Sequence, residues 1–434
     1  MAGWFAALIY LLNPNLLYLQ STAMTEPLGL ALMIWAVYFY CRFVAEQRKA
    51  LLEAIEEEAA VIHRRSATRA LIRCALVLTA AMLTRYDYWF LAVLVAIAVL
   101  FQLYGRYRDL SLVRYKQDIR RVLRKQFVAF IAVLAIVPVF WLAYNHAMFG
   151  NAMEFANGKY SARAIAVRSV RQGNPPHPGA GDLRVATTYY WKTARLNIGG
   201  NHAATAVVIV GLIGIIVLAF SEFTLAMLLF FPMVFYTFSI AHGGIPIFVP
   251  EWWPFSYYNV RYGIQLLPAI AVGYGYAMYI LRKSWNWRAL VLSGAVLLLA
   301  ALGAAYVMEW KKGPVCLREA EINSAGRIAL HKQLAAALQG LPADATFVVS
   351  LTEHVGAFQR AGIPLRRTWN ESSHHSGEPE FAFPLAQGDY VIAFDGDPVA
   401  RMVAEHPDDV KPVATLSVPG EKRCVIYKAT RKPS

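Results

Sequence analysis

The chain has 434 residues, of which 57% are hydrophobic and only 16% are charged, and its formal net charge is +14. Soluble domains usually carry about 45–50% apolar and about 25% charged residues, so this composition excludes an ordinary soluble protein. The basic residues cluster in connections beside apolar runs, which favours membrane lipid as a partner and argues against nucleic acid.

Apolar runs recur along the first two thirds of the chain, each long enough for a helix to cross a hydrocarbon core about 30 Å thick. They lie near residues 3–20, 27–44, 70–84, 88–104, 126–144, 203–220, 223–240, 261–281 and 289–308. The sequence therefore predicts a polytopic α-helical membrane protein with about nine transmembrane helices, whose membrane domain covers residues 1–308.

The connections between these runs differ in charge. The connection 105–125 is dense in arginine and lysine, and basic connections stay in the cytoplasm. Alternation then places the basic connections 45–69 and 282–288 on the same side. We expect an inner or plasma membrane protein with a cytoplasmic N-terminus, an outer loop over 145–200 and an extracytoplasmic C-terminal domain.

The long loop 145–200 mixes glycine, proline, aromatic and basic residues, which is typical of a functional loop. After residue 309 the pattern changes to an amphipathic helix over 319–340, followed by short β-rich runs and a helix over 398–405. The β-rich runs cover 345–350, 389–394 and 422–429. Residues 309–434 are therefore predicted to form a small α/β domain.

The chain has four cysteines. Cys41 and Cys74 lie within apolar runs, where a thiol usually serves as a small packing residue. Cys316 and Cys424 both fall in the predicted outer domain, where the compartment permits disulfides. They are a disulfide candidate that would tie the exit of the last span to the final strand, and two free thiols are the alternative.

Ionisable residues are rare in the middle of the spans and gather where spans meet the predicted outer face. Glu26, Arg85, Asp87, His146 and Arg261 form this group. An ion or proton pathway would need such residues at mid-depth. The pair at 374–375, two histidines in a polar turn, lacks metal-ligand spacing, so no metal site is predicted.

Each of these residues also has a structural explanation. Glu26 stands between Thr25 and Pro27, as at a capped helix start. Arg85 and Arg261 have aromatic neighbours, as in an interfacial belt. An arginine is also a natural partner of phosphate, because its planar fork gives paired hydrogen bonds.

A carboxylate and several arginines together at an outer membrane face suit a lipid-linked sugar phosphate. The arginines would neutralise the leaving phosphate, while the carboxylate would take a proton from the incoming hydroxyl. We therefore expect Glu26, Arg85 and Arg261 to converge on one outward-facing cavity.

Four segments in chain order carry a family resemblance. They are LNPNLLYLQSTAMTEPLGLALMIWAVYFY (12–40), LTAAMLTRYDYWFLAVLVA (78–96), VPVFWLAYNHAMFGNAMEF (137–155) and NVRYGIQLLPAIAVGYG (259–275). Together they resemble the GT-C membrane glycosyltransferases, in the branch that includes protein mannosyltransferases, aminoarabinose transferases and lipopolysaccharide-core transferases.

The resemblance implies a polyprenyl-phosphate-linked sugar as donor, transfer on the extracytoplasmic face, and a glycan, lipid or protein as acceptor. It also implies that a divalent cation could take part. Carried over by position, Glu26 matches the acidic residue that follows the family's third or so span. Arg85 matches the arginine that follows the family's next upward span. Asn145 matches the opening of a large outer loop, and Arg261 with Tyr262 matches a late RY motif.

Three further residues complete the expected site. Asp87 is a second candidate acid beside Glu26, Tyr86 is a candidate for stacking on a sugar, and His146 is a candidate substrate-binding residue beside Asn145. Members of the family usually begin with a further span and a long outer loop bearing acidic residues, which has no counterpart here. The expectation is a fragment of the enzyme or a chain that has lost this loop. A non-catalytic scaffold or lipid-glycan handling protein is the alternative.

Overall fold

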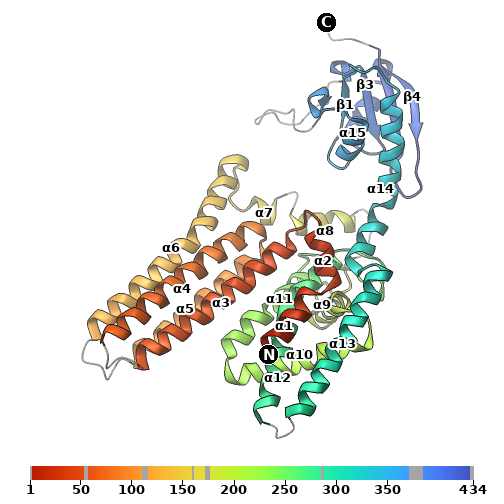
Figure 1. Ribbon diagram of the computed structural model, residues 1–434. Helices are drawn as coiled ribbons and strands as arrows, with labels where there is room; N and C mark the ends of the chain where they lie inside the picture. The colour runs from red at the N-terminus through yellow and green to blue at the C-terminus, as the bar shows by residue number, and fades with distance from the viewer. Residues whose placement is uncertain are drawn as a thin grey trace. The chain divides into compact units, whose positions relative to one another are not determined.

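The computed structural model describes residues 2–52, 57–109, 116–158, 161–171, 176–284, 288–370 and 385–430. The chain divides into two compact units, Met1–Glu319 and Ala320–Ser434 (Figure 1). Part of the predicted basic connection 105–125 and the histidine pair at 374–375 lie outside the described residues.

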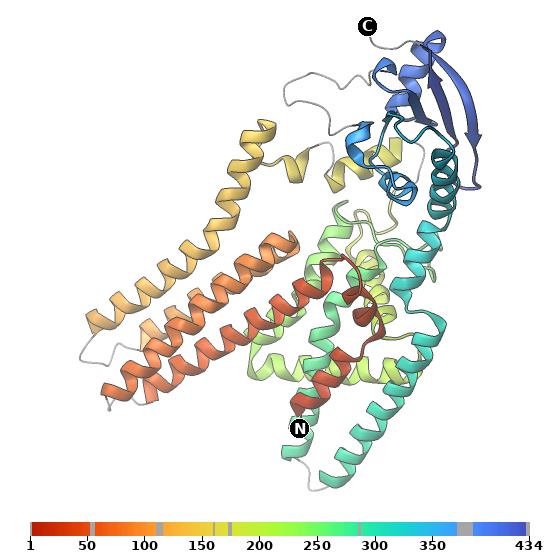
Figure 2. The same cartoon turned by 45° about the horizontal axis from the view of Figure 1, so that its top comes forward.

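The first unit is helical. Its elements are α1 (Ala2–Leu11), α2 (Pro14–Gln20), α3 (Glu26–Leu52), α4 (Glu57–Thr84), α5 (Asp87–Asp109), α6 (Lys116–Phe149), α7 (Glu154–Asn157), α8 (Ala162–Arg171), α9 (Leu183–Ile198), α10 (His202–Ser221), α11 (Phe223–Ala241), the 3-10 helix η2 (Val260–Leu266), α12 (Leu267–Ser284) and α13 (Arg288–Lys312). Helix α14 (Val315–Gln339) begins in this unit and continues into the second. Figures 1 and 2 show α3, α4, α5 and α6 running side by side.

Eight helices in the described part of the chain are long and apolar enough to cross a membrane, or nine if the bent pair α1 and α2 counts as one span. Such lengths and compositions suit a membrane protein. Close approach of two of these helices depends on glycine. A Cβ atom at Gly214 of α10 would overlap the carbonyl oxygen of Gly273 in α12, and small residues of this kind let membrane helices pack backbone to backbone.

The first predicted span, 3–20, is not one continuous helix. Helices α1 and α2 meet at an angle of 59°. Asn13 caps α2 in an extended conformation, and its side-chain oxygen accepts hydrogen bonds from the backbone N–H groups of Asn15 and Leu16. Proline disfavours the helical conformation in the residue before it, so Pro14 explains why α1 cannot continue through Asn13.

A buried polar network holds this break in place. The Asn13 side chain donates to the Asn197 carbonyl oxygen at 2.9 Å, and Asn15 donates to the same oxygen at 3.1 Å. The Asn15 side chain also accepts from the backbone N–H of Cys316 at 2.9 Å. Buried polar groups need such partners, and these bonds join α2 to α9 and to the start of α14. They explain why the first unit extends to Glu319 and not only to the predicted boundary at 308.

The predicted outer loop 145–200 is largely helical in its described residues. Helix α6 continues to Phe149 and ends at Gly150, whose φ of 69° is the left-handed conformation that glycine adopts readily. Helices α7, α8 and α9 follow. Helix α9 starts at an Asp182 cap, and its inner face, which includes Tyr189 and Tyr190, is buried in the core of the first unit.

The second unit is an α/β domain. Its elements after α14 are β1 (Phe347–Val349), α15 (Val355–Ala361), η3 (Leu365–Arg367), β2 (Thr368–Trp369), η5 (Leu385–Gln387), β3 (Tyr390–Phe394), α16 (Pro398–Glu405), η6 (Pro407–Asp409), β4 (Val410–Leu416) and β5 (Cys424–Ala429). The strand order is β2-β1-β3-β5-β4, parallel between β2, β1 and β3 and antiparallel at β5 and β4.

The sheet buries both of its faces. Phe347 and Ile392 pack with Leu334 of α14 on one face, while Val391 packs with Val399 of α16 on the other. Alternate residues of a strand point to opposite faces, so helices on both sides bury every residue of β3. The predicted strands at 345–350, 389–394 and 422–429 and the helix at 398–405 match β1, β3, β5 and α16.

All four cysteines, each within the described residues, are free in the structure, which for Cys316 and Cys424 corresponds to the alternative of two free thiols. Cys316 belongs to the buried core of the first unit, where its thiol lies 3.3 Å from the Asn197 side-chain oxygen. Cys424 is fully buried in the core of the second unit.

Candidate functional site

Glu26 is the first residue of α3, and its side chain is only 1% exposed. Its Oε1 atom accepts hydrogen bonds from two arginines, from Nη1 of Arg85 at 2.9 Å and from Nε of Arg261 at 3.0 Å. Its Oε2 atom is buried and has no hydrogen-bond partner among the described residues. Glu26, Arg85 and Arg261, which the sequence analysis expected to converge, are therefore joined by hydrogen bonds at one carboxylate oxygen.

Arg85 lies in the short break between α4 and α5, and each of its three side-chain nitrogens has a partner. Nε donates to both oxygens of Asp87 at 3.2 and 3.1 Å, Nη1 to Glu26, and Nη2 to the Tyr236 hydroxyl at 3.0 Å. Tyr236 in turn donates to Asp87 at 2.6 Å. The Arg85 side chain is only 10% exposed, so this residue is fixed in position.

Arg261 lies in η2, which begins after Asn259. Asn259 has a φ of 56°, a left-handed conformation that asparagine tolerates better than most residues, and its side chain donates to the Pro246 carbonyl oxygen at 2.9 Å. Beyond Glu26, the Arg261 contacts are long: Nη1 lies 3.6 Å from Oε1 of Glu319, and Nη2 lies 3.5 Å from the Tyr262 hydroxyl. Contacts of this length are weak or absent as hydrogen bonds, so Arg261 keeps donors for a ligand.

Tyr262 supports both guanidinium groups. The Arg85 guanidinium lies 4.7 Å from the centre of its ring, and the Arg261 guanidinium lies 4.8 Å from it. Both distances are within the range of a cation–π interaction. The ring also stacks on Tyr236 at 5.5 Å, which places the Tyr262 ring inside the cluster as the sequence predicted.

The cluster contains two arginines and three carboxylates, those of Glu26, Asp87 and Glu319. Removing ions from water costs several kcal/mol each, and a buried ion pair is often no more stabilising than well-packed apolar residues. Oε2 of Glu319, like Oε2 of Glu26, is buried without a hydrogen-bond partner among the described residues. Stability alone therefore does not explain this arrangement. Buried carboxylate oxygens without a partner are suited to accept a proton, or a hydrogen bond from a hydroxyl group.

Tyr236 and Glu319 belong to the cluster but were not predicted. Tyr236 lies within an apolar span, where a tyrosine is typical of an interfacial anchor. Glu319 lies in a mixed helical pattern, where a charged residue normally faces solvent. Neither has a local sequence signal that separates it from these ordinary roles.

An apolar slot adjoins the cluster. It has a volume of about 190 Å³ and is lined by residues of α4, α5 and α6, among them Leu83, Val137 and Trp141, together with Arg85. Arg85 is the only charged side chain among the described lining residues. The same arginine therefore lines an apolar slot and bonds to Glu26.

The remaining predicted residues lie outside the hydrogen-bonded cluster. Tyr86 lines the slot, is 49% exposed, and stacks on Phe155 at 4.9 Å. Asn145 donates to the Trp141 carbonyl oxygen at 2.8 Å within its own helix, and His146 is exposed. Neither Asn145 nor His146 forms a hydrogen bond or an ion pair with the described residues of the cluster. Both lie near the end of α6, after Trp141.

A larger cavity of about 550 Å³ is lined in part by α11. Its described lining includes Ile165 and Val170 of α8, His177, Ile240 of α11 and Phe248. Ile240 stands one helical turn after Tyr236 on α11. Tyr236 stacks on Tyr190 at 4.9 Å, and the neighbouring Tyr189 contacts His177 at 4.8 Å, so two adjacent tyrosines of α9 contact the cluster and a residue that lines the cavity.

No group of three or more His, Cys, Asp or Glu side chains in the described part of the chain is arranged to hold a metal ion. The cluster carboxylates are instead paired with arginines, so the divalent cation that the resemblance implies gains no ligand set from these residues. Comparisons of the chain with protein-family models, with curated proteins and with solved structures found no match.

Proposed function

We propose that this chain is a membrane-embedded glycosyltransferase that moves a sugar from a polyprenyl-phosphate donor to a hydroxyl group of a glycan, lipid or protein acceptor on the extracytoplasmic face. The observation that supports it best is the dual position of Arg85, which lines the apolar slot and bonds to Glu26. The prenyl chain of such a donor suits the apolar slot, and Glu26 joins Arg85 to Arg261, which keeps hydrogen-bond donors for the phosphate.

In this proposal the two arginines have different roles. All three side-chain nitrogens of Arg85 already have partners. Arg85 therefore mainly holds the carboxylates of Glu26 and Asp87 in position and contributes its positive charge to the site. Arg261 is 24% exposed and its terminal nitrogens make only long contacts. Arg261 is therefore the residue that gives the donor phosphate a paired hydrogen bond, in the bidentate geometry that lysine does not reproduce.

The reaction moves one proton and breaks one bond. The acceptor hydroxyl oxygen forms a bond to the anomeric carbon, the bond from that carbon to the phosphate oxygen breaks, and polyprenyl phosphate leaves with the bonding electrons. The hydroxyl proton passes to a carboxylate acting as general base. Nearby arginines stabilise the charge that grows on the leaving phosphate.

Glu26 suits the role of base better than Asp87 does. Both oxygens of Asp87 accept from Arg85, and one of them also accepts from Tyr236. Glu26 instead keeps one oxygen without a partner among the described residues, and a proton acceptor needs a free lone pair. Asp87 is therefore assigned to positioning Arg85 and Tyr236.

The cavity of about 550 Å³ is the proposed acceptor site. Its described lining is mainly aliphatic and aromatic, with Phe248, Tyr257 and Tyr258 along one side. Sugars and apolar acceptor groups both bind against aromatic rings of this kind.

The proposal is tested with purified protein in lipid nanodiscs, incubated with polyprenyl-phosphate sugars labelled in the sugar and with a panel of glycan, lipid and peptide acceptors. The same sugars carried on nucleotides are the control donors. We expect label to reach an acceptor from the lipid-linked donor alone. Transfer from the nucleotide donors alone, or no transfer across the panel, would contradict the proposal.

One observation favours the alternative, a non-catalytic protein that handles lipid-linked glycans. The cluster contains three carboxylates and only two arginines, so both arginines are already paired with carboxylates. Such a network can serve to hold α3, α5 and η2 together. Such a protein would bind polyprenyl phosphate, with an affinity that depends on Arg261, without transferring the sugar. Binding and transfer measured on the same preparation therefore separate the two functions.

A further inference from the structure

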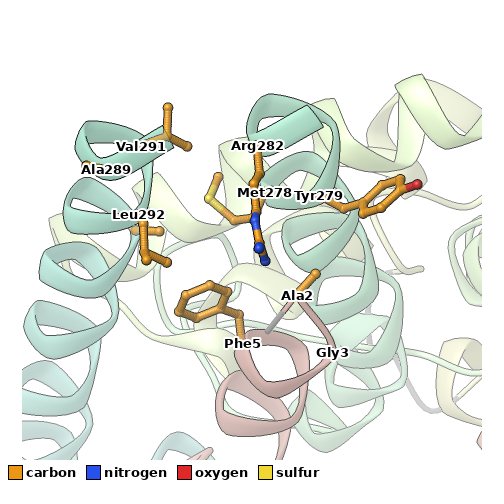
Figure 3. Close-up of a pocket in the computed structure, with 10 residues that line it drawn as sticks. Ala2, Gly3, Phe5, Met278, Tyr279, Arg282, Ala289, Val291 and Leu292 are labelled. Carbon is orange, nitrogen blue, oxygen red and sulfur yellow. The ribbon is translucent and has the colours of Figure 1, made fainter. Parts of the chain in front are cut away.

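A third pocket lies at the end of α12 that is remote from Arg261. It has a volume of about 430 Å³ and is lined by residues of α1, α12 and α13 (Figure 3). Phe5 of α1, Met278 of α12 and Leu292 of α13 give it apolar walls. Arg282 lies in the last turn of α12, and Figure 3 shows its side chain extending into the space between these helices.

Arg282 has no counter-charge in this pocket. It is the only charged side chain among the described lining residues, and it makes no hydrogen bond or ion pair with any described residue. It is exposed, so water or a ligand satisfies its donors. A basic side chain near a helix C-terminus is stabilised by the helix dipole, but this effect does not explain the apolar pocket around it.

The three helices that form the pocket are fixed to one another. A Cβ atom at Gly275 of α12 would lie 2.7 Å from the Ala2 carbonyl oxygen, so α1 packs directly on the α12 backbone. The Phe5 ring packs edge-on against Tyr274 at 6.4 Å. The Tyr274 hydroxyl donates to the Ala295 carbonyl oxygen of α13 at 3.3 Å. The pocket is therefore formed before a ligand arrives, which lowers the cost of binding.

We propose that this pocket binds one anionic glycerophospholipid, with the lipid phosphate on Arg282 and an acyl chain along Phe5, Met278 and Leu292. The occupant must be apolar for most of its contact and negatively charged at one end, and an anionic phospholipid combines both properties. Basic pockets between membrane helices bind such headgroups on the cytoplasmic side, the side predicted for the connection 282–288. The proposal is independent of sugar transfer.

The test uses delipidated full-length protein and native mass spectrometry, with phosphatidylglycerol or phosphatidylcholine of identical acyl chains as the probe. We expect one phosphatidylglycerol to bind more tightly than the other copies, and phosphatidylcholine to lack this site. Arg282→Ala should weaken that binding about fivefold, the value of one basic residue near anionic lipid. Lys283→Ala is the matched control, because Lys283 is the exposed neighbour and does not line the pocket.

A second variant fills the pocket and leaves Arg282 unchanged. Gly3 lines the pocket, and a Cβ atom there would meet no atom within 4 Å, so Gly3→Leu should fold and yet exclude the acyl chain. Gly303→Leu is its control, since a Cβ at Gly303 also meets no atom within 4 Å and Gly303 does not line the pocket.

The proposal would be overturned by equal loss of binding in Arg282→Ala and Lys283→Ala, by equal binding of both lipids, or by unchanged binding in a Gly3→Leu protein that keeps the wild-type melting temperature. Inorganic phosphate competing as well as the lipid would assign the site to free anions and would also overturn it.

Discussion

Nε of Arg261 lies 3.0 Å from Oε1 of Glu26, although the two residues stand 235 positions apart in the chain. The contact joins the start of α3 to η2, and Arg85 donates to the same oxygen from the break between α4 and α5. Three helix starts or breaks thus meet at a single carboxylate oxygen. The sequence places charges at these points, and the fold brings them together.

Tyr236→Phe should destabilise the protein. The Tyr236 hydroxyl accepts from Arg85 and donates to Asp87, so its removal leaves buried charged groups short of partners, at a cost of about 1–3 kcal/mol. Thermal unfolding in detergent measures this. Tyr190→Phe is the matched control, because that ring is equally buried and its hydroxyl makes only one long bond, of 3.4 Å, to the Tyr262 carbonyl oxygen. Equal losses in the two variants would argue against a special role for the Tyr236 hydroxyl.

Arginine-to-lysine changes should separate the two arginines. Arg261→Lys keeps the charge but loses the planar fork, so we expect a KM for the lipid donor raised about tenfold and a melting temperature close to wild type. Arg85→Lys should lower the melting temperature more, because a lysine cannot reach Asp87, Glu26 and Tyr236 together. Donor titrations and thermal unfolding of both variants check this, and the reverse pattern would exchange the two roles.

Stability should fall in mildly acidic solution because of His177. Its Nε2 donates to the Ile247 carbonyl oxygen at 2.8 Å while its Nδ1 accepts from the Gly179 N–H at 2.9 Å, a pattern that requires the neutral ring. Burial lowers the pKa of His177 below its ordinary value of 6.5, opposed by the bond to Ile247. As pH falls below about 6.5 the unfolded chain binds this proton first, so the free energy of unfolding decreases.

Unfolding measured between about pH 7.5 and 5.5 tests this linkage. His177→Gln should flatten the part of the decline that His177 causes, whereas His406→Gln, at an exposed position in the second unit, should leave the wild-type curve. An unchanged slope in His177→Gln would show that His177 does not carry the pH dependence.

The predicted orientation gives opposite labelling results at two exposed positions. Lys283 lies in the last turn of α12, at its predicted cytoplasmic end, and Asp395, with a side chain 54% exposed, lies in the predicted outer domain. In intact cells a membrane-impermeant maleimide should label Asp395→Cys and should label Lys283→Cys only after permeabilisation. Labelling of Lys283→Cys alone in intact cells would reverse the orientation.

Much of the helical pattern follows from local sequence, because the length and hydropathy of a run suffice to place a helix of membrane-spanning size. The break between α1 and α2 was missed although Asn13-Pro14 is a readable breaker, since the apolar residues on both sides suggested a single span. The network of Asn13, Asn15 and Asn197 could not be predicted, because its bonds join segments more than 180 residues apart.

The site divides in the same way. Glu26, Arg85 and Arg261 were predictable because they belong to the small group of ionisable residues that gather where apolar spans end. Tyr236 and Glu319 were not, because their importance comes only from which residues they meet in space. The sequence also left two alternatives open for Cys316 and Cys424, because it does not show in which core each thiol is buried.

The most direct test of the proposed catalysis compares sugar transfer by wild type, Glu26→Gln and Glu251→Gln at saturating lipid donor. Glu26→Gln keeps the side-chain shape but removes the proposed base, so transfer per folded molecule should fall about 100- to 10,000-fold, the usual contribution of a general base. Glu251→Gln makes the same change in an exposed ion pair with Arg195, whose side chains are 41% and 36% exposed, and should transfer like wild type. Folded protein is quantified for each variant, since Glu26 also pairs with two arginines. Transfer by folded Glu26→Gln within about twofold of wild type would contradict the proposed mechanism.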